Sequence, residues 1–345
     1  MSLQPFLMCS SSVIYGQRVE LIAMLDTTVV QEFQRIVGTT HALQEEALTA
    51  GYTTDWTGRF KGSSPMVLRP ADTSEVSELV KVALRAGLSI VPQGGNTGLV
   101  GGSVPLHQEI VVSTLRMDHC EPVDALAQQV TVGSGVTLAD AQSHVSSLNL
   151  EIGVDLAARD SCTIGGMIAT NAGGINVVRY GPMRDQILGI EAVLSDGSII
   201  SHLEGLEKDN TGYNFPGLLA GSEGTLAIIT KARLRLHPRL SERCSAMIAF
   251  RTVDDAVVAT SQLRGALPTL QAVEVIFSEA MSLVSDHIGA SVPVGAGSEA
   301  WLVVEVAAST DPTDELATAI GNLGPLAVDV AVGLDTATRN GLWQY

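Results

Sequence analysis

The sequence predicts an α+β protein made of two units. Short apolar runs with the length of β-strands alternate with amphipathic segments that repeat at helical spacing. Two glycine-rich segments interrupt this pattern, at residues 92–102 and 161–174, and a boundary at 237–239 separates it from a second series of strands and helices. The 345 residues suffice for about two domains, at roughly 150 residues per domain.

The first part of the chain predicts a helix followed by a strand–helix–strand unit. Apolar residues in 27–37 fall on one side of a helix. Asp72 or Thr73 can cap a helix at 74–86, because short polar side chains accept hydrogen bonds from the first turn. Strands at 67–68 and 90–91 flank this helix, and the second strand ends at the first glycine-rich segment.

Residues 110–236 have a richer β pattern. The Asp196-Gly197 pair is typical of a hairpin turn, and Thr137 with Asp140 marks the start of a helix. The expected elements are strands at 110–112, 129–132, 187–194, 198–202 and 225–236, and a helix at 137–148.

The residues after His237-Pro238-Arg239 predict a smaller α+β unit. Strands and helices alternate in it, as expected for helices that cover a sheet. The expected strands are 245–250, 271–277, 301–306 and 327–331, and the expected helices are 253–264, 279–287 and 314–323.

The composition excludes several classes of partner. Hydrophobic residues make up 46% of the chain and charged residues 17%, which favours a folded protein with a large core. The net charge of −17 argues against nucleic acid and against anionic membrane surfaces, because both select basic proteins. No apolar run approaches the roughly 20 residues that span a bilayer, so we expect no transmembrane segment.

The cysteines and the N-terminus predict a cytoplasmic protein. Cys9, Cys120, Cys162 and Cys244 are scattered without a CxxC pair, which favours reduced thiols over disulfides. The start lacks the basic region of a signal peptide, and we expect residues 1–23 to be an unstructured extension, with Met24 as an alternative start.

The first glycine-rich segment, PQGGNTGLVGG, suits a diphosphate. Glycines let backbone N–H groups approach a ligand closely, and Asn96 and Thr97 add polar side chains. The segment is neither GxGxxG nor a phosphate loop ending in GK[ST], which disfavours a Rossmann dehydrogenase and a P-loop ATPase. Taken alone, it is equally compatible with a turn between strands.

The second glycine-rich segment, SCTIGGMIATNAGG, combines hydroxyl and amide side chains with apolar anchors. A flat aromatic ring with polar edges requires this mixture. Two such loops indicate a long dinucleotide that is held from two sides. Arg179, which follows, fits a phosphate ligand or a surface residue equally well.

Four motifs in order carry a resemblance to a known family: PQGGNTGLVGG, GVDLAARDSCTIGGMIATNAGG, RYGPMRDQILGIEAVLSDG and GSEGTLAIITKARLRL. With the entry segment at 55–59, they resemble the FAD-binding domain of the vanillyl-alcohol oxidase / p-cresol methylhydroxylase superfamily. Within it they are most similar to FAD-linked D-2-hydroxyacid dehydrogenases, which include D-lactate dehydrogenase, the glycolate oxidase flavin subunit and D-2-hydroxyglutarate dehydrogenase. The resemblance implies a helical segment at 1–54, a two-subdomain FAD-binding domain at 55–240, and a partial, ferredoxin-like α+β cap at 241–345.

The resemblance also implies which residues contact FAD. Some members attach FAD covalently through a histidine in the first segment; this chain has Asn96 and no histidine there, so we expect non-covalent FAD. The expected cofactor-binding residues are Pro92, Gly94, Gly95, Asn96, Thr97, Gly98, Leu99, Ser161, Cys162, Ile164, Gly165, Gly166, Ala169, Thr170, Asn171, Gly173, Gly174, Glu223, Gly224 and Ile229.

The implied reaction is the oxidation of a small D-2-hydroxy acid to the 2-oxo acid. A hydride passes to flavin N5, and the electrons go on to an external acceptor that the sequence does not identify. The family's histidine-rich HxGDGNxH and EHG motifs are absent, so no catalytic residue and no metal ligand is assigned. Arg59 lies in the matched region but fits a surface or packing role at least as well.

The absent motifs leave two alternatives to a complete dehydrogenase. In the first, the chain is a truncated, non-catalytic FAD-binding protein; in the second, it is an electron-relay flavin subunit that passes electrons to another chain. We further expect self-association, because a cap sheet that stops at Tyr345 would expose an edge strand and apolar surface.

Overall fold

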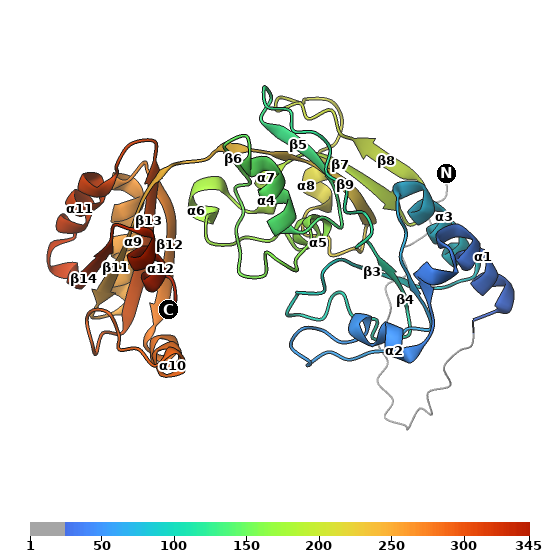
Figure 1. Ribbon diagram of the computed structural model, residues 1–345, viewed down its shortest axis with the longest axis horizontal. Coiled ribbons are helices and arrows are strands. Elements are labelled where there is room, and N and C mark those ends of the chain that lie inside the picture. Colours follow the sequence, from blue (N-terminus) through green and yellow to red (C-terminus); the bar gives the residue numbers. More distant parts are fainter. Residues whose placement is uncertain (1–24) are drawn as a thin grey trace, which may run out of the picture.

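The structure, a computed structural model, describes residues 25–345. Figure 1 shows a larger N-terminal part on the right and a smaller C-terminal unit on the left, joined by extended chain. The expectations for the unstructured extension at 1–23, the start at Met24 and Cys9 lie outside the described residues.

The first sheet is mainly parallel. Its order is β1 (Ala42–Leu43), β2 (Val67–Leu68), β4 (Ile110–Ser113) and β3 (Ile90–Gln93), with only β1 antiparallel. Parallel strands need a crossover, and α3 (Thr73–Arg85) supplies it between β2 and β3. Helix α1 (Thr27–Val37) packs with α3 over a core that contains Phe33, Met66 and Leu79.

The second sheet is antiparallel, in the order β5 (Gln129–Gly133), β9 (Ala227–Arg235), β7 (Ile187–Leu194) and β8 (Ile199–His202). The turn between β7 and β8 contains Gly197 at φ 83°, a conformation that glycine adopts without strain. Helices of the same part are α4 (Leu138–Ser146), α5 (Ile164–Thr170), α7 (Met183–Gln186) and α8 (Phe215–Leu219).

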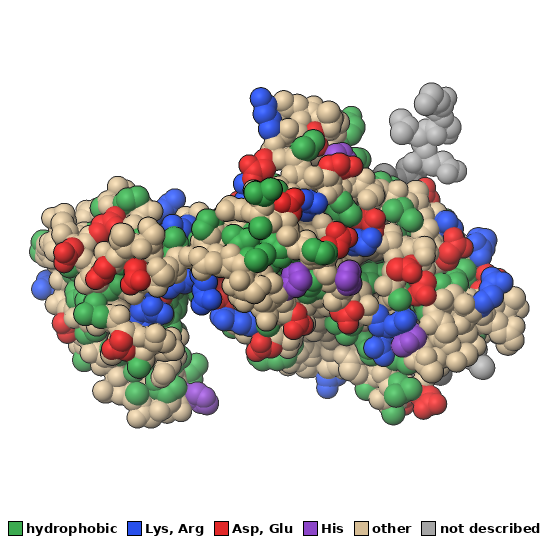
Figure 2. All heavy atoms as spheres, turned by 45° about the horizontal axis from the view of Figure 1, so that its top comes forward, with side chains coloured by type: hydrophobic (Ala, Val, Ile, Leu, Met, Phe, Trp, Pro, Cys, Tyr) green, Lys and Arg blue, Asp and Glu red, His purple; other side chains and the backbone are tan. Residues whose placement is uncertain are grey.

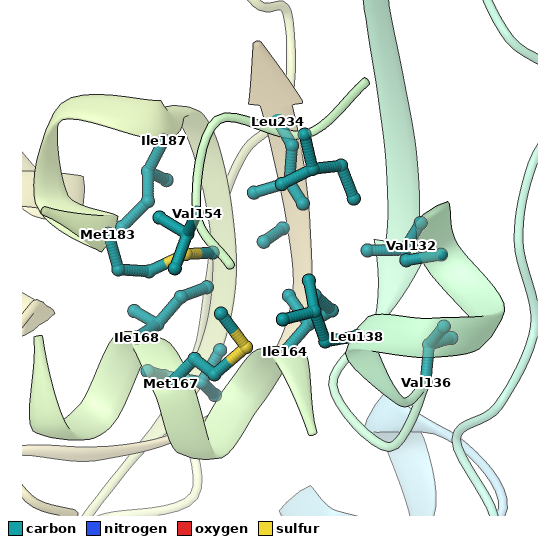
Figure 3. Close-up of a cluster of buried hydrophobic side chains, with 14 of the residues drawn as sticks. Val132, Val136, Leu138, Val154, Ile164, Met167, Ile168, Met183, Ile187 and Leu234 are labelled. Carbon is teal, nitrogen blue, oxygen red and sulfur yellow. The ribbon is translucent and has the colours of Figure 1, made fainter. Parts of the chain in front are cut away.

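Helix α5 is anchored in the main core of this part. Figure 3 shows Ile164, Met167 and Ile168 of α5 among buried side chains that include Met183 and Leu234. Ile164 and Ile168 are completely buried. Since interiors are packed as densely as organic crystals, this anchoring fixes the position of the glycine-rich segment that contains α5.

A buried carboxylate connects helix α3 to the second sheet of the N-terminal part. Glu191 of β7 accepts hydrogen bonds from Thr73 (2.5 Å) and Thr230 (3.2 Å), and lies 3.3 Å from the ammonium of Lys231. Burial alone would raise the pKa of Glu191, but the Thr73 hydrogen bond and the Lys231 charge lower it. The ionised carboxylate therefore ties α3 to the second sheet.

The C-terminal unit is an antiparallel sheet covered on both faces. Its order is β12 (Leu270–Phe277), β13 (Ala300–Ala308), β11 (Glu242–Phe250) and β14 (Ala327–Gly333). Successive side chains of β11 alternate between two clusters. One cluster contains α9 (Val253–Ala266) and α11 (Thr313–Gly321), and the other contains α10 (Ser278–Ile288) and α12 (Thr336–Leu342).

Strands β12 and β14 are the edges of this sheet, and apolar side chains near them are exposed. Phe277 is 47% exposed, Val332 48% and Leu334 63%. Exposed edges and apolar patches favour association. Self-association of the chain stays a prediction.

The two parts meet at a polar junction. Helix α6 (Val177–Tyr180) lies against β12, and the Arg179 guanidinium donates to the backbone oxygens of Thr269 and Ala307, both at 3.1 Å. Strand β10 (His237–Pro238) pairs with β6 (Leu150–Glu151) beside it. Arg179 is therefore neither a phosphate ligand nor a free surface residue; it fastens the C-terminal unit to the rest.

The elements expected from the sequence are confirmed, with boundaries that differ by a few residues. The main difference is at 161–174, interpreted as a loop, where residues 164–170 form α5. Thr163 caps this helix by accepting a hydrogen bond from Gly166 N–H, and Asn171 ends it at φ 49°. The helix was not predicted because the segment contains two glycines, and glycine disfavours helix interiors. The short elements β1, β6, β10, α2 (Glu46–Thr49), α6, α7, α8 and α12 were not predicted.

His237 makes the junction sensitive to acid. Its ring stacks on Tyr180 with centroids 4.2 Å apart, and its Nε2 lies 3.0 Å from Gln186 Oε1. Burial, with the Arg235 and Arg179 charges, lowers the pKa of His237 to about 4. Burial also raises the pKa of Tyr180 to about 12, so both rings are neutral at pH 7.

We expect the free energy of unfolding to fall as the pH drops from 6.5 to 4. The folded-state pKa of His237 lies below the ordinary value of 6.5, so the unfolded chain binds the proton first in this window. The free energy of unfolding has its full value above pH 6.5, and protonation of His237 lowers it by about 2–3 kcal/mol by pH 4. Urea unfolding of the native chain and of His237→Phe, which keeps a ring on Tyr180, measures it. Equal pH slopes for the two proteins would contradict the prediction; His287→Gln, at an exposed histidine, is the control.

Candidate functional site

A cavity of about 450 Å³ opens between the two glycine-rich segments and the start of β9. Both sheets of the N-terminal part contribute to its wall. Most residues predicted to bind a cofactor line it: Pro92, Gly94, Gly95, Asn96, Thr97, Gly98, Leu99, Cys162, Gly165, Gly166, Ala169, Thr170, Glu223, Gly224 and Ile229.

The remaining predicted residues do not line this cavity; they are Ser161, Ile164, Asn171, Gly173 and Gly174. Ile164 lies in the core, and the Asn171 side chain accepts a hydrogen bond from the backbone N–H of Arg184 (2.9 Å). Gly174 has φ 103° and lies so close to the backbone of Asp155 that a Cβ would overlap it.

Several wall residues were not assigned from the sequence: Gln93, Val100, Gly102, Ser103, Thr114, Leu156, Ala158, Thr163, Met167, Ala172, Ala227 and Ile228. Leu156 and Ala158 lie inside the quoted motif GVDLAARD, so the motif itself signalled them. Ala227 and Ile228 begin β9, and their neighbour Ile229 was predicted.

The two glycine-rich segments touch through their backbones. A Cβ placed on Gly95 would lie 1.8 Å from the carbonyl oxygen of Ser161, and one on Gly94 would lie 2.2 Å from Thr163 Oγ1. Real side chains do not approach so closely, so glycine is required at both positions. This contact sets the width of the cavity.

Backbone N–H groups supply the polar wall. Within the described part of the chain, no acceptor binds the N–H groups of residues 94–103. Asn96 has φ 53°, and its amide donates to Thr54 O (2.8 Å) and accepts from Ser103 Oγ (2.8 Å), which holds the loop in shape. A run of N–H groups without protein acceptors can bind an anion without any basic side chain.

Part of the wall is apolar. Leu156, Met167 and Ile229 contribute to it, and Glu223, which also lines the cavity, adopts a left-handed conformation at φ 49°. Cys162 also lines the cavity, and burial raises the pKa of its thiol, which keeps it protonated. No histidine is among the described residues of the wall.

An anion-binding run of amides beside an apolar wall defines a site for a dinucleotide with a flat ring. The diphosphate would bind the N–H groups of the first segment, and the ring would lie against the apolar side. The unpartnered N–H groups and the apolar side chains of the wall fit such a cofactor.

Comparison with known proteins identifies this cofactor. The family model described as "FAD binding domain" matches residues 64–202, and the model described as "FAD linked oxidases, C-terminal domain" matches residues 239–345. These matches show an FAD-binding domain followed by the C-terminal domain of FAD-linked oxidases, and FAD is the cofactor. Non-covalent attachment and the contacts of individual residues with FAD stay predictions.

The chain is similar to two mitochondrial D-2-hydroxyglutarate dehydrogenases. The Arabidopsis thaliana protein is 34% identical over 88% of this chain and 55% of its own length. The Bos taurus protein is 38% identical over 74% of this chain and 47% of its own length. The chain thus spans about half the length of each relative. The cytoplasmic location expected from the sequence is wrong in this light, because these relatives are named as mitochondrial.

The fold is that of the vanillyl-alcohol oxidase / p-cresol methylhydroxylase type. The solved structure of p-cresol methylhydroxylase with substrate bound superimposes with a TM-score of 0.70 at 15% identity, over 92% of this chain and 71% of that one. This agreement confirms the predicted α+β, FAD-binding fold class.

Metal-ligating side chains are not gathered in the described residues. No group of three His, Cys, Asp or Glu side chains there could hold a metal ion. Arg59 is exposed and does not line the FAD cavity, which agrees with its surface interpretation. Among residues 25–345, no helix has the length and apolar character to cross a bilayer.

Proposed function

We propose that the chain carries the flavin site of an oxidoreductase that oxidises a small D-2-hydroxy acid to the 2-oxo acid. The cavity of free amides and apolar side chains, in a chain similar to D-2-hydroxyglutarate dehydrogenases, supports the proposal. FAD, when bound, supplies the two-electron redox chemistry, and a separate acceptor takes the electrons.

The protein's own part is to hold and orient the cofactor. Amides of residues 94–103 would bind the diphosphate, and Leu156, Met167 and Ile229 would exclude water from the ring. The contact between Gly95 and Ser161 keeps the two walls at a fixed separation. The base that removes the hydroxyl proton is not assigned to any described residue.

A binding role without turnover is the second candidate. The observation in its favour is that the described residues contain the predicted flavin cavity but hold no cluster of metal ligands. In that case the chain binds FAD or relays electrons but does not oxidise the acid itself.

An anaerobic absorption spectrum separates the two candidates. The FAD-loaded chain is mixed with D-2-hydroxyglutarate, with D-lactate and, as the stereochemical control, with L-2-hydroxyglutarate. We expect the flavin absorption to bleach with a D acid and to persist with the L acid. An unchanged flavin spectrum with every acid supports the binding role, and absence of bound flavin after reconstitution contradicts both.

A further inference from the structure

A second cavity, of about 460 Å³, lies at the junction of the two parts. It shares no lining residue with the FAD cavity. We call it the junction cavity; the charged and amide residues in its wall are Gln142, Glu151, Asp155, Asn176, Arg239, Arg243 and Arg339. Figure 2 shows Lys and Arg side chains on both sides of this junction.

Two of its three arginines lack a carboxylate partner. Arg243 is shared between Glu151 and Glu305, each at 3.1 Å, and Asp155 pairs with Arg159 at 2.9 Å. No carboxylate of the described residues lies within ion-pair distance of Arg239 or Arg339. These two guanidiniums give the cavity its positive excess.

One buried donor group in the wall also lacks a partner. Asn176 is only 9% exposed, and its side chain does not cap helix α6, so its amide is available to a ligand. The Nε of Arg339 is buried without an acceptor, while its Nη1 donates to Arg243 O at 3.4 Å. Buried polar groups are normally satisfied, so the unpartnered Arg339 Nε–H indicates a missing acceptor, and the buried, unpartnered Asp155 Oδ1 in the same wall indicates a missing donor.

The size of the cavity favours an organic acid over an inorganic ion. Its volume lies in the range of about 300–1,000 Å³ that small-molecule sites occupy, and a lone phosphate would leave most of it empty. Guanidinium groups bind carboxylates through paired hydrogen bonds, and the Asn176 and Gln142 amides offer donors and acceptors to the remainder of the molecule.

We propose that the junction cavity binds a small organic acid, with its carboxylate on Arg239 and Arg339 and a polar contact to Asn176. Asn176 belongs to the N-terminal part, Arg339 lies on α12, and Arg239 lies in the connection between the parts. The ligand therefore bridges the two parts and stabilises their docking. The site is additional to the flavin site and goes beyond the proposed function.

Calorimetric titration of the FAD-loaded, oxidised chain with succinate tests the proposal. Succinate has no hydroxyl group to oxidise, so its binding is independent of turnover. We expect saturable binding and a higher Tm. Arg239→Gln, Arg339→Gln and Asn176→Leu should each weaken binding, the arginine changes by about tenfold or more, since a hydrogen bond to a charged group contributes at least that factor. If one of the three single variants fails to fold, the other two still test the proposal.

Arg264→Gln is the matched control, because Arg264 is exposed on α9 and forms no ion pair in the described chain. Absence of saturable succinate binding, or equal binding by all variants, overturns the proposal. Inorganic phosphate that binds as tightly as succinate and competes with it would reduce the site to a simple anion site and overturns the assignment to an organic acid. The outcome is independent of the flavin-bleaching experiment, because succinate leaves the flavin oxidised.

Discussion

Gly95→Ala is expected to remove FAD from the protein. The new methyl group would lie 1.8 Å from the Ser161 carbonyl oxygen and 3.2 Å from the Cys162 Cα, so the two glycine-rich segments must separate. Both neighbours are backbone atoms, which cannot move aside as a flexible side chain could. Overpacking of this kind costs about 1–3 kcal/mol or more, and we expect FAD affinity to fall by about 100-fold or more.

The flavin content of the purified variant and its thermal unfolding measure this effect. Gly98→Ala is the matched control in the same segment, because a Cβ there meets nothing within 4 Å and its φ is not positive. The apoprotein of Gly98→Ala should unfold within about 0.5 kcal/mol of the native apoprotein. A Gly95→Ala protein that retains stoichiometric FAD and native stability would show that the segments are not in contact.

Arg243→Leu is expected to loosen the docking of the C-terminal unit. The Arg243 guanidinium bridges Glu151 of β6 and Glu305 of β13, and the Glu305 side chain is only 10% exposed. Loss of the arginine leaves two largely buried carboxylates without their cation. Removal of one partner from a buried pair costs about 3–5 kcal/mol; because these groups retain some exposure, we expect about 2–4 kcal/mol.

Urea unfolding measures the loss, and the double variant Arg243→Leu/Glu305→Leu tests its cause. If the stranded carboxylate is responsible, the double variant should be more stable than Arg243→Leu alone. Arg264→Leu, at an exposed and unpaired position among the described residues, controls for the loss of an arginine. A loss below about 0.5 kcal/mol for Arg243→Leu would mean that the bridge does not hold the junction.

The sequence predicts the regular elements well because their signals are local. The apolar alternation of β7 and the Asp72 cap of α3 each depend on a few neighbouring residues. Helix α5 was missed because its stability comes from Ile164 and Ile168 in the core, which is a tertiary effect that outweighs two glycines.

The candidate site could be predicted in part for the same reason. Glycines that must approach a ligand appear as a motif, so Gly94 and Gly95 were found from the sequence. The role of Arg179 could not be predicted from the sequence. Its acceptors, the backbone oxygens of Thr269 and Ala307, lie in a unit far along the chain. The junction cavity likewise brings together Asn176 and Arg339, and no local pattern links two such positions.

The meeting of Gly95 with Ser161 has a consequence for the order of folding. Each residue belongs to a different part of the sequence, so the cofactor site exists only after both sheets have formed and docked. FAD therefore has no partial site to occupy in an early intermediate, and it captures only chains that have completed this docking. Bound FAD then stabilises the docked arrangement of the two segments by a free energy that grows with the FAD concentration relative to Kd.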